Sequence, residues 1–377
     1  MAIKFNKEAK SPNIENVTIN FDSIRRKELS IEELLIFATE NECSDLYIKL
    51  FDYPYVSKFG KIFKVPCQPI DKSQWNDFYK FNVSNEYNAQ YVREKILDTS
   101  TTIRVPQTSP NYGTIEFYTY RSNFGFSNDN NIVTFRMIKP KKITFDNINF
   151  NEKCKQALLL AYSEKTGICI ETGPTGSGKS TTLAACINTF TQPGGVLDNK
   201  VIITLEDPIE NIFYSTDTVK INQKELGTDF LSFNLGIKAA LREHPNVIIV
   251  GEMRDKEVIC TTLEAARTGH LVSTTFHSDS VGGTVARILY HLDNDKNLSF
   301  DLISQFNIII SQRMLKRDDR YLVDTQYLLF NKEITDYLIK VIENPNLNVS
   351  VEVNNLIKRT DLQQAGLAKD WDYPEEV

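Results

Sequence analysis

Gly173-Pro174-Thr175-Gly176-Ser177-Gly178-Lys179-Ser180 is the stretch that decides the fold, because it reads G-x-x-x-x-G-K-S, the pattern of a phosphate-binding P-loop. A short apolar, β-leaning stretch, residues 167–170, precedes it, and a helical pattern that begins at Thr181 follows it. A strand, a glycine loop and a helix N-terminus together direct backbone N–H groups at phosphate oxygens. The spacing predicts that Lys179 contacts the β- and γ-phosphates and that the Ser180 hydroxyl ligates Mg²⁺.

A chance match is the alternative explanation of this motif. The bare pattern arises in roughly one chain of this length in a hundred. The strand before it and the helix after it reduce that frequency further. We therefore expect a nucleotide to bind at residues 173–180 and at Thr181, the first residue of the helical pattern.

Composition limits the class of protein. The length of 377 residues favours two or more domains. A net charge of −6 and a pI near 5.5 argue against a general nucleic-acid binder, although a local basic patch stays open. No apolar run approaches the ~20 residues of a membrane span, and the first residues lack the apolar core of a signal peptide. The cysteines form no C-x-x-C pair, so we expect buried, reduced thiols and a cytosolic compartment.

The first 138 residues have the pattern of an α+β domain with an antiparallel sheet. Residues 1–28 are polar and mixed, and they predict a loose or partly strand-like arm. Ser30 and Glu33 form a capping box that opens a helix to about Thr39. The expected strands and helices that follow are a strand at 44–50, a hairpin around Gly60, one or two helices within 71–97, and strands at 101–105, 113–121 and 131–138.

A second pattern begins after the charged, proline-containing linker at 139–145. Short apolar runs alternate with helical patterns, which is typical of a parallel sheet with crossover helices. We expect this domain to span residues 146–365 and to turn helical from about residue 279. A polar tail at 366–377 is predicted to be disordered.

Two predicted strands end in acidic residues, at the edge where parallel sheets bind ligands. The apolar strand at 246–250 leads into Glu252, as in a Walker B element, and Glu252 would polarise the attacking water; a solvated acid at a strand end is the alternative. The strand at 201–205 leads into Glu206, Asp207 and Glu210. Two of these carboxylates could influence the ligand shell of Mg²⁺ or the attacking water. The alternative is that the Asp-Pro pair only starts a turn.

Two histidines and two arginines are further candidates. His270 and His277 bracket the strand at 271–275, and one of them could face the γ-phosphate as a donor, although a lone histidine is more often structural. Arg121 and Arg136 lie on the last strands of the first domain. Either could serve as an arginine finger across a subunit interface, or both are ordinary surface arginines.

These boxes, in this order, resemble the secretion-superfamily ATPases, the hexameric motors of type IV pili and of type II and type IV secretion. Residues 173–180 match the Walker A box, 204–210 the Asp box, 250–255 the Walker B box, and 265–277 the His box of that family. Residues 44–48 and 58–61 resemble its PAS-like N-terminal domain.

The resemblance implies a PAS-like domain at 29–138 followed by a RecA-like ATPase domain. It implies ATP and Mg²⁺ as cofactors, Glu252 as the catalytic base, and Glu206 as support for the metal and the water. By the same resemblance His270 and His277 sense the γ-phosphate, and Arg121 and Arg136 act between subunits. The implied assembly is a homo-hexamer in the cytoplasm, associated with inner-membrane components of a secretion or pilus machine.

The subfamily implied by the resemblance rests on fewer residues. The chain lacks the tetracysteine module of pilus-extension and type II motors, which leaves the pilus-retraction branch and the branch of type IVB secretion and conjugation. The stretch Thr274-Thr275-Phe276-His277 favours the second branch. A RecA-like nucleic-acid translocase and a catalytically inactive, nucleotide-gated scaffold are the alternatives from other classes; the acidic balance opposes the first, and Lys179, Ser180 and Glu252 oppose the second.

Overall fold

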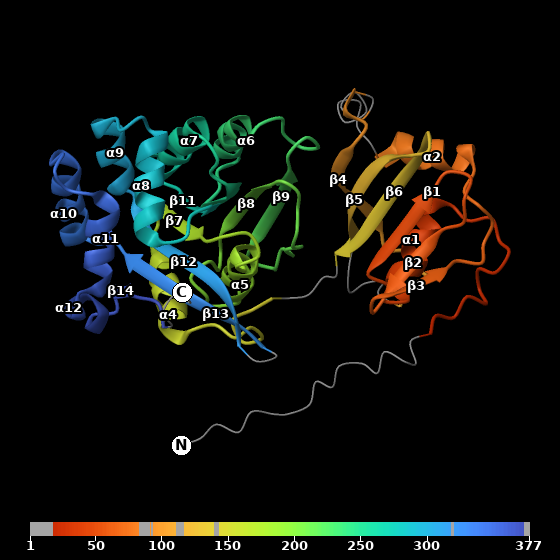
Figure 1. Ribbon diagram of the computed structural model, residues 1–377, viewed down its shortest axis with the longest axis horizontal. Helices are drawn as coiled ribbons and strands as arrows, with labels where there is room; N and C mark the ends of the chain where they lie inside the picture. The colour runs from red at the N-terminus through yellow and green to blue at the C-terminus, as the bar shows by residue number, and fades with distance from the viewer. Residues whose placement is uncertain are drawn as a thin grey trace, which may run out of the picture. The chain divides into compact units, whose positions relative to one another are not determined.

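The structure is a computed structural model that describes residues 18–82, 91, 93–110, 117–138, 143–317 and 320–372. The chain divides into two compact units, residues 1–140 and 141–377 (Figure 1). The division falls inside the predicted linker at 139–145, whose first four residues lie outside the described part.

In the described residues, the N-terminal unit is an antiparallel sheet on which the helices α1 and α2 pack. The strand order is β3-β2-β1-β6-β5-β4. Its elements are α1 (Ile31–Glu40), β1 (Asp45–Lys49), β2 (Tyr55–Lys58), β3 (Lys61–Lys64), α2 (Lys72–Asn82), β4 (Leu97–Arg104), β5 (Phe117–Ser127) and β6 (Asn130–Ile138). This arrangement confirms the predicted PAS-like α+β class.

The capping box and the aromatic side chains explain why these residues form this unit. The Glu33 carboxylate accepts from the Ser30 N–H at 2.8 Å, and Ser30 Oγ accepts from the Glu33 N–H at 3.1 Å, so both ends of the box are made. Aromatic side chains of α2 pack edge-on against the sheet, where Phe78 and Phe135 have ring centroids 5.4 Å apart. This packing buries the helix face that the aromatic residues define.

Three sequence predictions differ from the observed N-terminal unit. The last strands are longer than predicted, since β4 begins at Leu97 and β5 continues to Ser127. The start of the predicted strand at 113–121 lies outside the described residues. The arm at 1–28 is not loose where it is described, because Ile24 is buried and Phe21 packs on the core. These apolar side chains gain more by burial than a free arm would gain in chain entropy.

The second unit is a mixed sheet of eight strands, in the order β14-β13-β12-β7-β11-β10-β8-β9. Its strands are β7 (Gly167–Thr172), β8 (Val201–Glu206), β9 (Lys220–Glu225), β10 (Val247–Glu252), β11 (Leu271–Phe276), β12 (Phe306–Arg317), β13 (Arg320–Leu329) and β14 (Ala368–Lys369). Its helices are α4 (Glu152–Ser163), α5 (Lys179–Phe190), α6 (Phe233–Ala240), the short 3-10 helix η2 (Leu241–Glu243), α7 (Lys256–Arg267), α8 (Val281–His291), α9 (Lys296–Ile303), α10 (Lys332–Glu343), α11 (Val349–Lys358) and α12 (Thr360–Gln364).

The centre of this sheet is the predicted RecA-like core. Strands β12, β7, β11, β10, β8 and β9 run parallel, and every residue of β7 and β11 is buried. Strands buried on both faces are near-continuous apolar runs, which is the pattern of Gly167–Ile170. The carboxyl ends of β7, β8, β10 and β11 therefore meet at one edge of the sheet.

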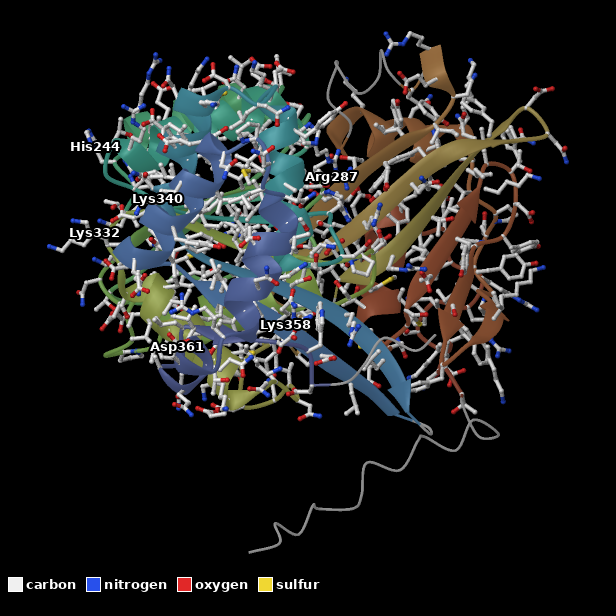
Figure 2. All side chains as sticks on the ribbon, turned by 60° about the vertical axis from the view of Figure 1, so that its left-hand side comes forward. His244, Arg287, Lys332, Lys340, Lys358 and Asp361 are labelled. Atoms are coloured by element: carbon white, nitrogen blue, oxygen red, sulfur yellow. The ribbon has the colours of Figure 1, made fainter. Side chains whose placement is uncertain are left out.

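The helices that follow the core turn one apolar face inward. In α10, Ile334, Leu338 and Val341 are buried at helical spacing. Lys332 and Lys340 of the same helix project from the outer surface (Figure 2). The amphipathic pattern thus gives the orientation of α10 directly.

The prediction of a helical chain from about residue 279 is wrong for residues 306–329. Residues 306–317 and 320–329 form β12 and β13, a long antiparallel pair whose first strand lies parallel to β7. The run Ile308-Ile309-Ile310 is buried and β-branched, which is the signal for a core strand that the sequence carried.

The predicted disordered tail is also wrong in its described part. Residues 366–372 pack onto β13, where Ala368 and Lys369 pair with Leu328 and Tyr327 as β14. Ala368 is buried, and the Lys369 amine donates to the Thr325 and Asp370 carbonyls. A short apolar segment and a buried, fully bonded amine hold this segment to the fold. Residues 373–377 lie outside the described part.

Candidate active site

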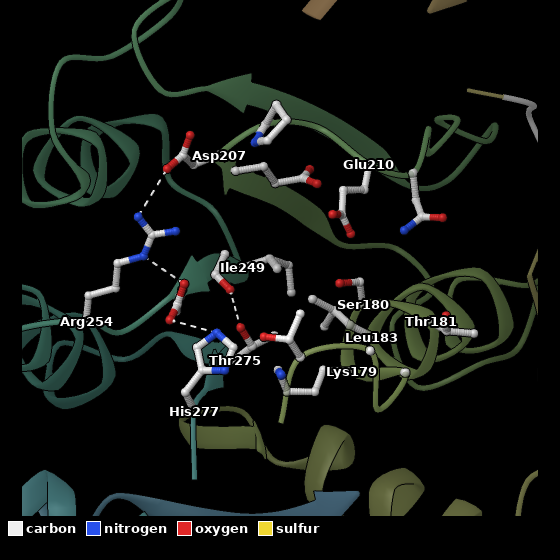
Figure 3. A pocket seen from close by; sticks show the side chains of 18 of the residues that line it. Lys179, Ser180, Thr181, Leu183, Asp207, Glu210, Ile249, Arg254, Thr275 and His277 are labelled. Carbon is white, nitrogen blue, oxygen red and sulfur yellow. Dashed lines mark hydrogen bonds and ion pairs between the residues drawn. The ribbon is translucent and has the colours of Figure 1, made fainter. Parts of the chain in front are cut away.

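A cleft of about 520 Å³ lies at the carboxyl edge of the parallel strands (Figure 3). Parallel α/β sheets place their ligands at this edge. The cleft collects side chains from the P-loop and from the ends of β8, β10 and β11. Its polar lining includes Lys179, Ser180, Thr181, Glu206, Asp207, Glu210, Glu252, Arg254, Thr275 and His277.

The P-loop has the backbone of an anion cradle. Gly176 and Gly178 adopt φ values of 80° and 94°, a left-handed conformation that glycine adopts without strain. Gly178 leads directly into α5, so the N–H groups of the first helical turn face the cleft. Lys179 Nζ lies 2.7 Å from the Gly173 carbonyl oxygen and 3.0 Å from that of Pro174. The amine is therefore held within the loop that would surround a phosphate.

Burial and two carboxylates act on Lys179 in opposite directions. Burial lowers the pKa of the Lys179 amine, and the negative charges of Glu252 and Glu210 raise it. The amine is thus the positive group of the P-loop in a cleft that also carries several acids and Arg254. A phosphate chain in the loop would supply it with a closer anion.

The residues present fit a nucleotide with its Mg²⁺. Ser180 and Thr181 are exposed at the start of α5, where their hydroxyls are free to meet a metal or a phosphate. The Ser177 hydroxyl is buried without a hydrogen-bond partner inside the described loop. Mg²⁺ keeps waters and substrate phosphates in its shell and takes few protein ligands, and the exposed Ser180 hydroxyl can supply one of them.

Glu252 lies at the centre of a chain of polar contacts. Arg254 Nε donates to Glu252 Oε2 at 2.7 Å, and His277 Nε2 lies 3.2 Å from Glu252 Oε1. Arg254 Nη1 also reaches Asp207 Oδ2 at 3.3 Å, so the guanidinium links the ends of β8 and β10. The Thr275 hydroxyl donates to the Gly251 carbonyl at 2.6 Å and fixes the end of β10 against β11. A carboxylate fixed in this way in a P-loop cleft is placed to orient a water molecule.

Glu206 lies on the same wall and is more enclosed. Its Oε1 accepts from Thr204 Oγ1 at 2.6 Å and from Gln223 Nε2 at 2.9 Å. Burial raises the pKa of the Glu206 carboxyl to about 7, and these two hydrogen bonds oppose the rise. The structure thus places Glu206 in the cleft, as the sequence predicted.

The family becomes clear at this point. The sequence profile described as "Type II/IV secretion system protein" matches residues 116–333 of the chain. The type IV pilus retraction ATPase PilT of Pseudomonas aeruginosa is 31% identical over 77% of this chain and 79% of its own length. The chain is a secretion-superfamily ATPase.

Two solved structures share its fold. The ATPase DotB of Legionella pneumophila superimposes with a TM-score of 0.75 and 24% identity, over 94% of this chain and 97% of that one. The pilus retraction motor PilT with bound ADP superimposes with a TM-score of 0.69 and 30% identity, over 88% of this chain and 90% of that one. Both have an N-terminal domain followed by a RecA-like domain, as this ATPase does.

One histidine of the predicted pair is misplaced for this cleft. His277 lines it, but His270 lies at the other end of β11, where its Nδ1 is 3.0 Å from the Ala265 carbonyl oxygen. The six residues of β11 separate the two imidazoles by roughly 20 Å at 3.3 Å per residue. The prediction that His270 senses the γ-phosphate is therefore wrong for the cleft of its own chain. The bond to Ala265 gives His270 a structural role at the end of α7.

Arg121 and Arg136 belong to the N-terminal unit, whereas the cleft residues belong to the second unit. They are direct cross-strand neighbours on β5 and β6, and so share one face of the sheet. Arg121 pairs with Asp98 at 2.6 Å and Arg136 with Asp45 at 3.0 Å. The two carboxylates offset the repulsion of adjacent guanidinium groups on this solvent-facing side.

Arg254 and Met314 were missed as cleft residues. Arg254 stands two positions after Glu252, so its spacing was a usable signal. Met314 enters the cleft from β12, a strand in a region that the sequence predicted to be helical.

Within the described residues no helix is long and apolar enough to cross a membrane.

A buried acid supports the P-loop from below. Glu171, on β7, is fully buried; Tyr162 donates to its Oε1 at 3.0 Å and Ser273 to its Oε2 at 3.2 Å. These bonds connect α4, β7 and β11 at the end of the strand that leads into Gly173. Burial raises the pKa of the Glu171 carboxyl to about 7, above its ordinary value of 4.5.

We expect Glu171→Gln to remove part of the pH dependence of stability. Below pH 4.5 the carboxyl is protonated in both states, and nothing is lost. Between pH 4.5 and about 7 only the unfolded chain releases the proton, so stability falls as pH rises. The loss is on the order of 3 kcal/mol at pH 8. Urea unfolding at pH 4 and pH 8 should show equal stability of the two proteins at pH 4 and greater stability of the variant at pH 8.

The exposed Glu264→Gln variant is the matched control, since it removes a carboxylate from the solvent side of α7. It should retain the pH slope of the unmodified chain. An unchanged slope in Glu171→Gln would contradict the assignment of that slope to Glu171.

Proposed function

We propose that this chain hydrolyses ATP with Mg²⁺ in the cleft at the P-loop. The observation that carries the proposal is the convergence of Lys179, Glu252 and His277 on one cleft, with His277 and Glu252 in contact at 3.2 Å. Lys179 binds the β- and γ-phosphates. Glu252 takes a proton from the attacking water, and His277 contacts the γ-phosphate.

Ser180 and Glu206 are the protein groups proposed to hold Mg²⁺, directly or through water. When bound, the ion neutralises charge on the β- and γ-phosphates. Thr204 and Gln223 bond to Glu206 Oε1 and so hold the carboxyl in the wall of the cleft. A positive ion beside a carboxyl whose pKa is raised by burial favours the ionised form.

We further propose that the active site is completed in a homo-hexameric ring. Arg121 and Arg136 are the candidates to act across the subunit interface. They are cross-strand neighbours on an exposed sheet face, and their own side chains are 46% and 73% accessible. Developing charge on the γ-phosphate would be stabilised by a guanidinium from the neighbour. To contact the phosphate, Arg121 would leave Asp98 and Arg136 would leave Asp45.

The machine proposed for this motor is a type IV secretion system of the IVB or conjugation type, at the cytoplasmic face of the inner membrane. The stretch Thr274–His277 and the fold similarity to DotB support it. A type IV pilus retraction motor is the second candidate, supported by 31% sequence identity to PilT. A nucleic-acid translocase has less support, since the chain is acidic, with a pI near 5.5.

Deletion of the gene in its host separates the two machines. Loss of conjugative transfer or of protein secretion, with surface motility unchanged, is the expected result. Loss of surface motility with normal transfer would replace the secretion proposal with pilus retraction. Re-introduction of the wild-type gene should restore the lost phenotype, and the Glu252→Gln gene should not.

A further inference from the structure

We infer that Arg313, Asp324 and Trp371 form a clamp that positions the P-loop from the back of the sheet, which makes them positioning residues for nucleotide binding. The inference rests on the proposed function only in taking residues 173–180 as the nucleotide site. It concerns the end of the chain, where the sequence indicated only a polar tail.

Strand β12 contacts the P-loop and the helix that follows it. A side chain on Gly173 would place its Cβ 2.2 Å from the Gln312 carbonyl oxygen, so the two backbones are in close contact there. Gln312 Nε2 also donates to Thr182 Oγ1 at 2.8 Å, in the first turns of α5. Met314, two residues on, lines the cleft. A shift of β12 would therefore move the floor on which the phosphate loop lies.

Arg313 is anchored by an ion pair. It stands between Gln312 and Met314, so its side chain points to the opposite face of the strand. Its Nε and Nη2 donate to Asp324 Oδ2 on β13 at 3.2 and 3.0 Å. Asp324 is 0% accessible and Arg313 16%. A nearly buried ion pair is costly to break, because one partner would be left as an uncompensated charge.

Trp371 and Asp372 contact this ion pair. The guanidinium carbon of Arg313 lies 4.3 Å from the ring centroid of Trp371, a cation–π contact. The Asp372 N–H donates to Asp324 Oδ1 at 2.9 Å, so the same carboxylate is bonded on its other side. Lys369 Nζ lies 3.0 Å from Asp372 Oδ2 and 2.8 Å from the Thr325 carbonyl oxygen.

Through these contacts, residues 368–372 help to position the P-loop. They hold the Arg313–Asp324 pair, the pair fixes β12 against β13, and β12 supports Gly173 and α5. Arg313, Asp324 and Trp371 do not line the cleft, so their loss should weaken nucleotide binding and leave the chemical step nearly unchanged.

The test compares Trp371→Ala, Trp371→Phe and Arg313→Lys in the full chain. We expect Trp371→Ala to raise the KM for ATP and the Kd for ADP about fivefold to tenfold, with kcat within about twofold. Trp371→Phe retains an aromatic face and should restore both constants to within about twofold. Arg313→Lys retains the charge but loses the planar fork, and it should resemble the alanine variant.

Tyr327→Phe separates positioning from stability. It removes the bond from the Tyr327 hydroxyl to the Gly366 carbonyl at 3.0 Å, which anchors the start of the same segment away from Arg313. It should lower the Tm and leave the KM unchanged. An equal rise of KM in Tyr327→Phe, at an equal loss of Tm, would reduce the clamp to a stability effect and overturn the inference.

Tryptophan emission gives a reading that does not depend on turnover. Only Trp75 and Trp371 are present, and Trp75 lies in the core of the N-terminal unit. Titration with ADP and Mg²⁺ should change the emission of the wild-type chain, and Trp371→Phe should abolish that change. An ADP-dependent change of equal size in both proteins, or ADP binding that none of the clamp variants alters, would refute the inference. Absence of ATP hydrolysis in the wild type would refute the proposed function and leave this titration valid.

Discussion

Glu252→Gln should abolish ATP hydrolysis and leave nucleotide binding intact. The glutamine has the same shape, and its amide oxygen can still accept from Arg254 Nε, which lies 2.7 Å from the carboxylate. It cannot take a proton from water. Loss of a positioned general base lowers kcat by about 10²- to 10⁴-fold. Phosphate release measures the rate, and ADP titration calorimetry measures the binding that should be retained.

Glu264→Gln is the matched control for this substitution, because it neutralises an exposed acid on the helix that follows the Walker B strand. It should hydrolyse ATP at the wild-type rate. A Glu252→Gln variant that still turns over within a few-fold of wild type would remove Glu252 from the role of base. Parallel loss of hydrolysis and of ADP binding would instead make Glu252 a binding group.

Lys179→Ala should lose nucleotide affinity itself. The amine is held by the Gly173 and Pro174 carbonyls inside the loop, whereas Arg254, which also lines the cleft, is bonded to Glu252 and Asp207. A charge-assisted hydrogen bond contributes about 1.5–3 kcal/mol, so the Kd for ADP should rise roughly 10- to 150-fold. Calorimetry at fixed Mg²⁺ measures the change.

Lys238→Ala serves as its control, since Lys238 is exposed on α6 and does not line the cleft. It should bind ADP as the wild type does. Unchanged affinity in Lys179→Ala would mean that the phosphates lie elsewhere, and the P-loop assignment would be lost.

Sequence and structure agree best where function depends on local spacing. The glycine loop, Lys179 and Ser180 form one contiguous segment, and Glu252 follows an apolar strand whose end must lie at the ligand edge of a parallel sheet. The histidines show the limit of this reasoning. Spacing could not decide between His270 and His277, because the answer depends on where β11 ends, and it ends at Phe276.

Contacts between distant segments could not be predicted from the sequence. Arg313 meets Asp324 eleven residues later and Trp371 near the end of the chain, and no local pattern shows either contact. Lys369 and Asp372 looked like polar tail residues because their partners on β13 are visible only after folding. Glu171 in an otherwise apolar strand was the clearest missed signal, since a buried carboxyl requires partners.

The most direct test of the account measures ATP hydrolysis per subunit against protein concentration, with Glu252→Gln, Arg121→Ala and Arg136→Ala beside the wild type. We expect the wild-type rate per subunit to rise steeply with concentration as rings assemble, the Glu252 variant to be inactive at every concentration, and at least one arginine variant to assemble without gaining activity. A rate per subunit that does not depend on concentration, and that survives Glu252→Gln, would contradict both the base and the shared active site, and only nucleotide binding would remain.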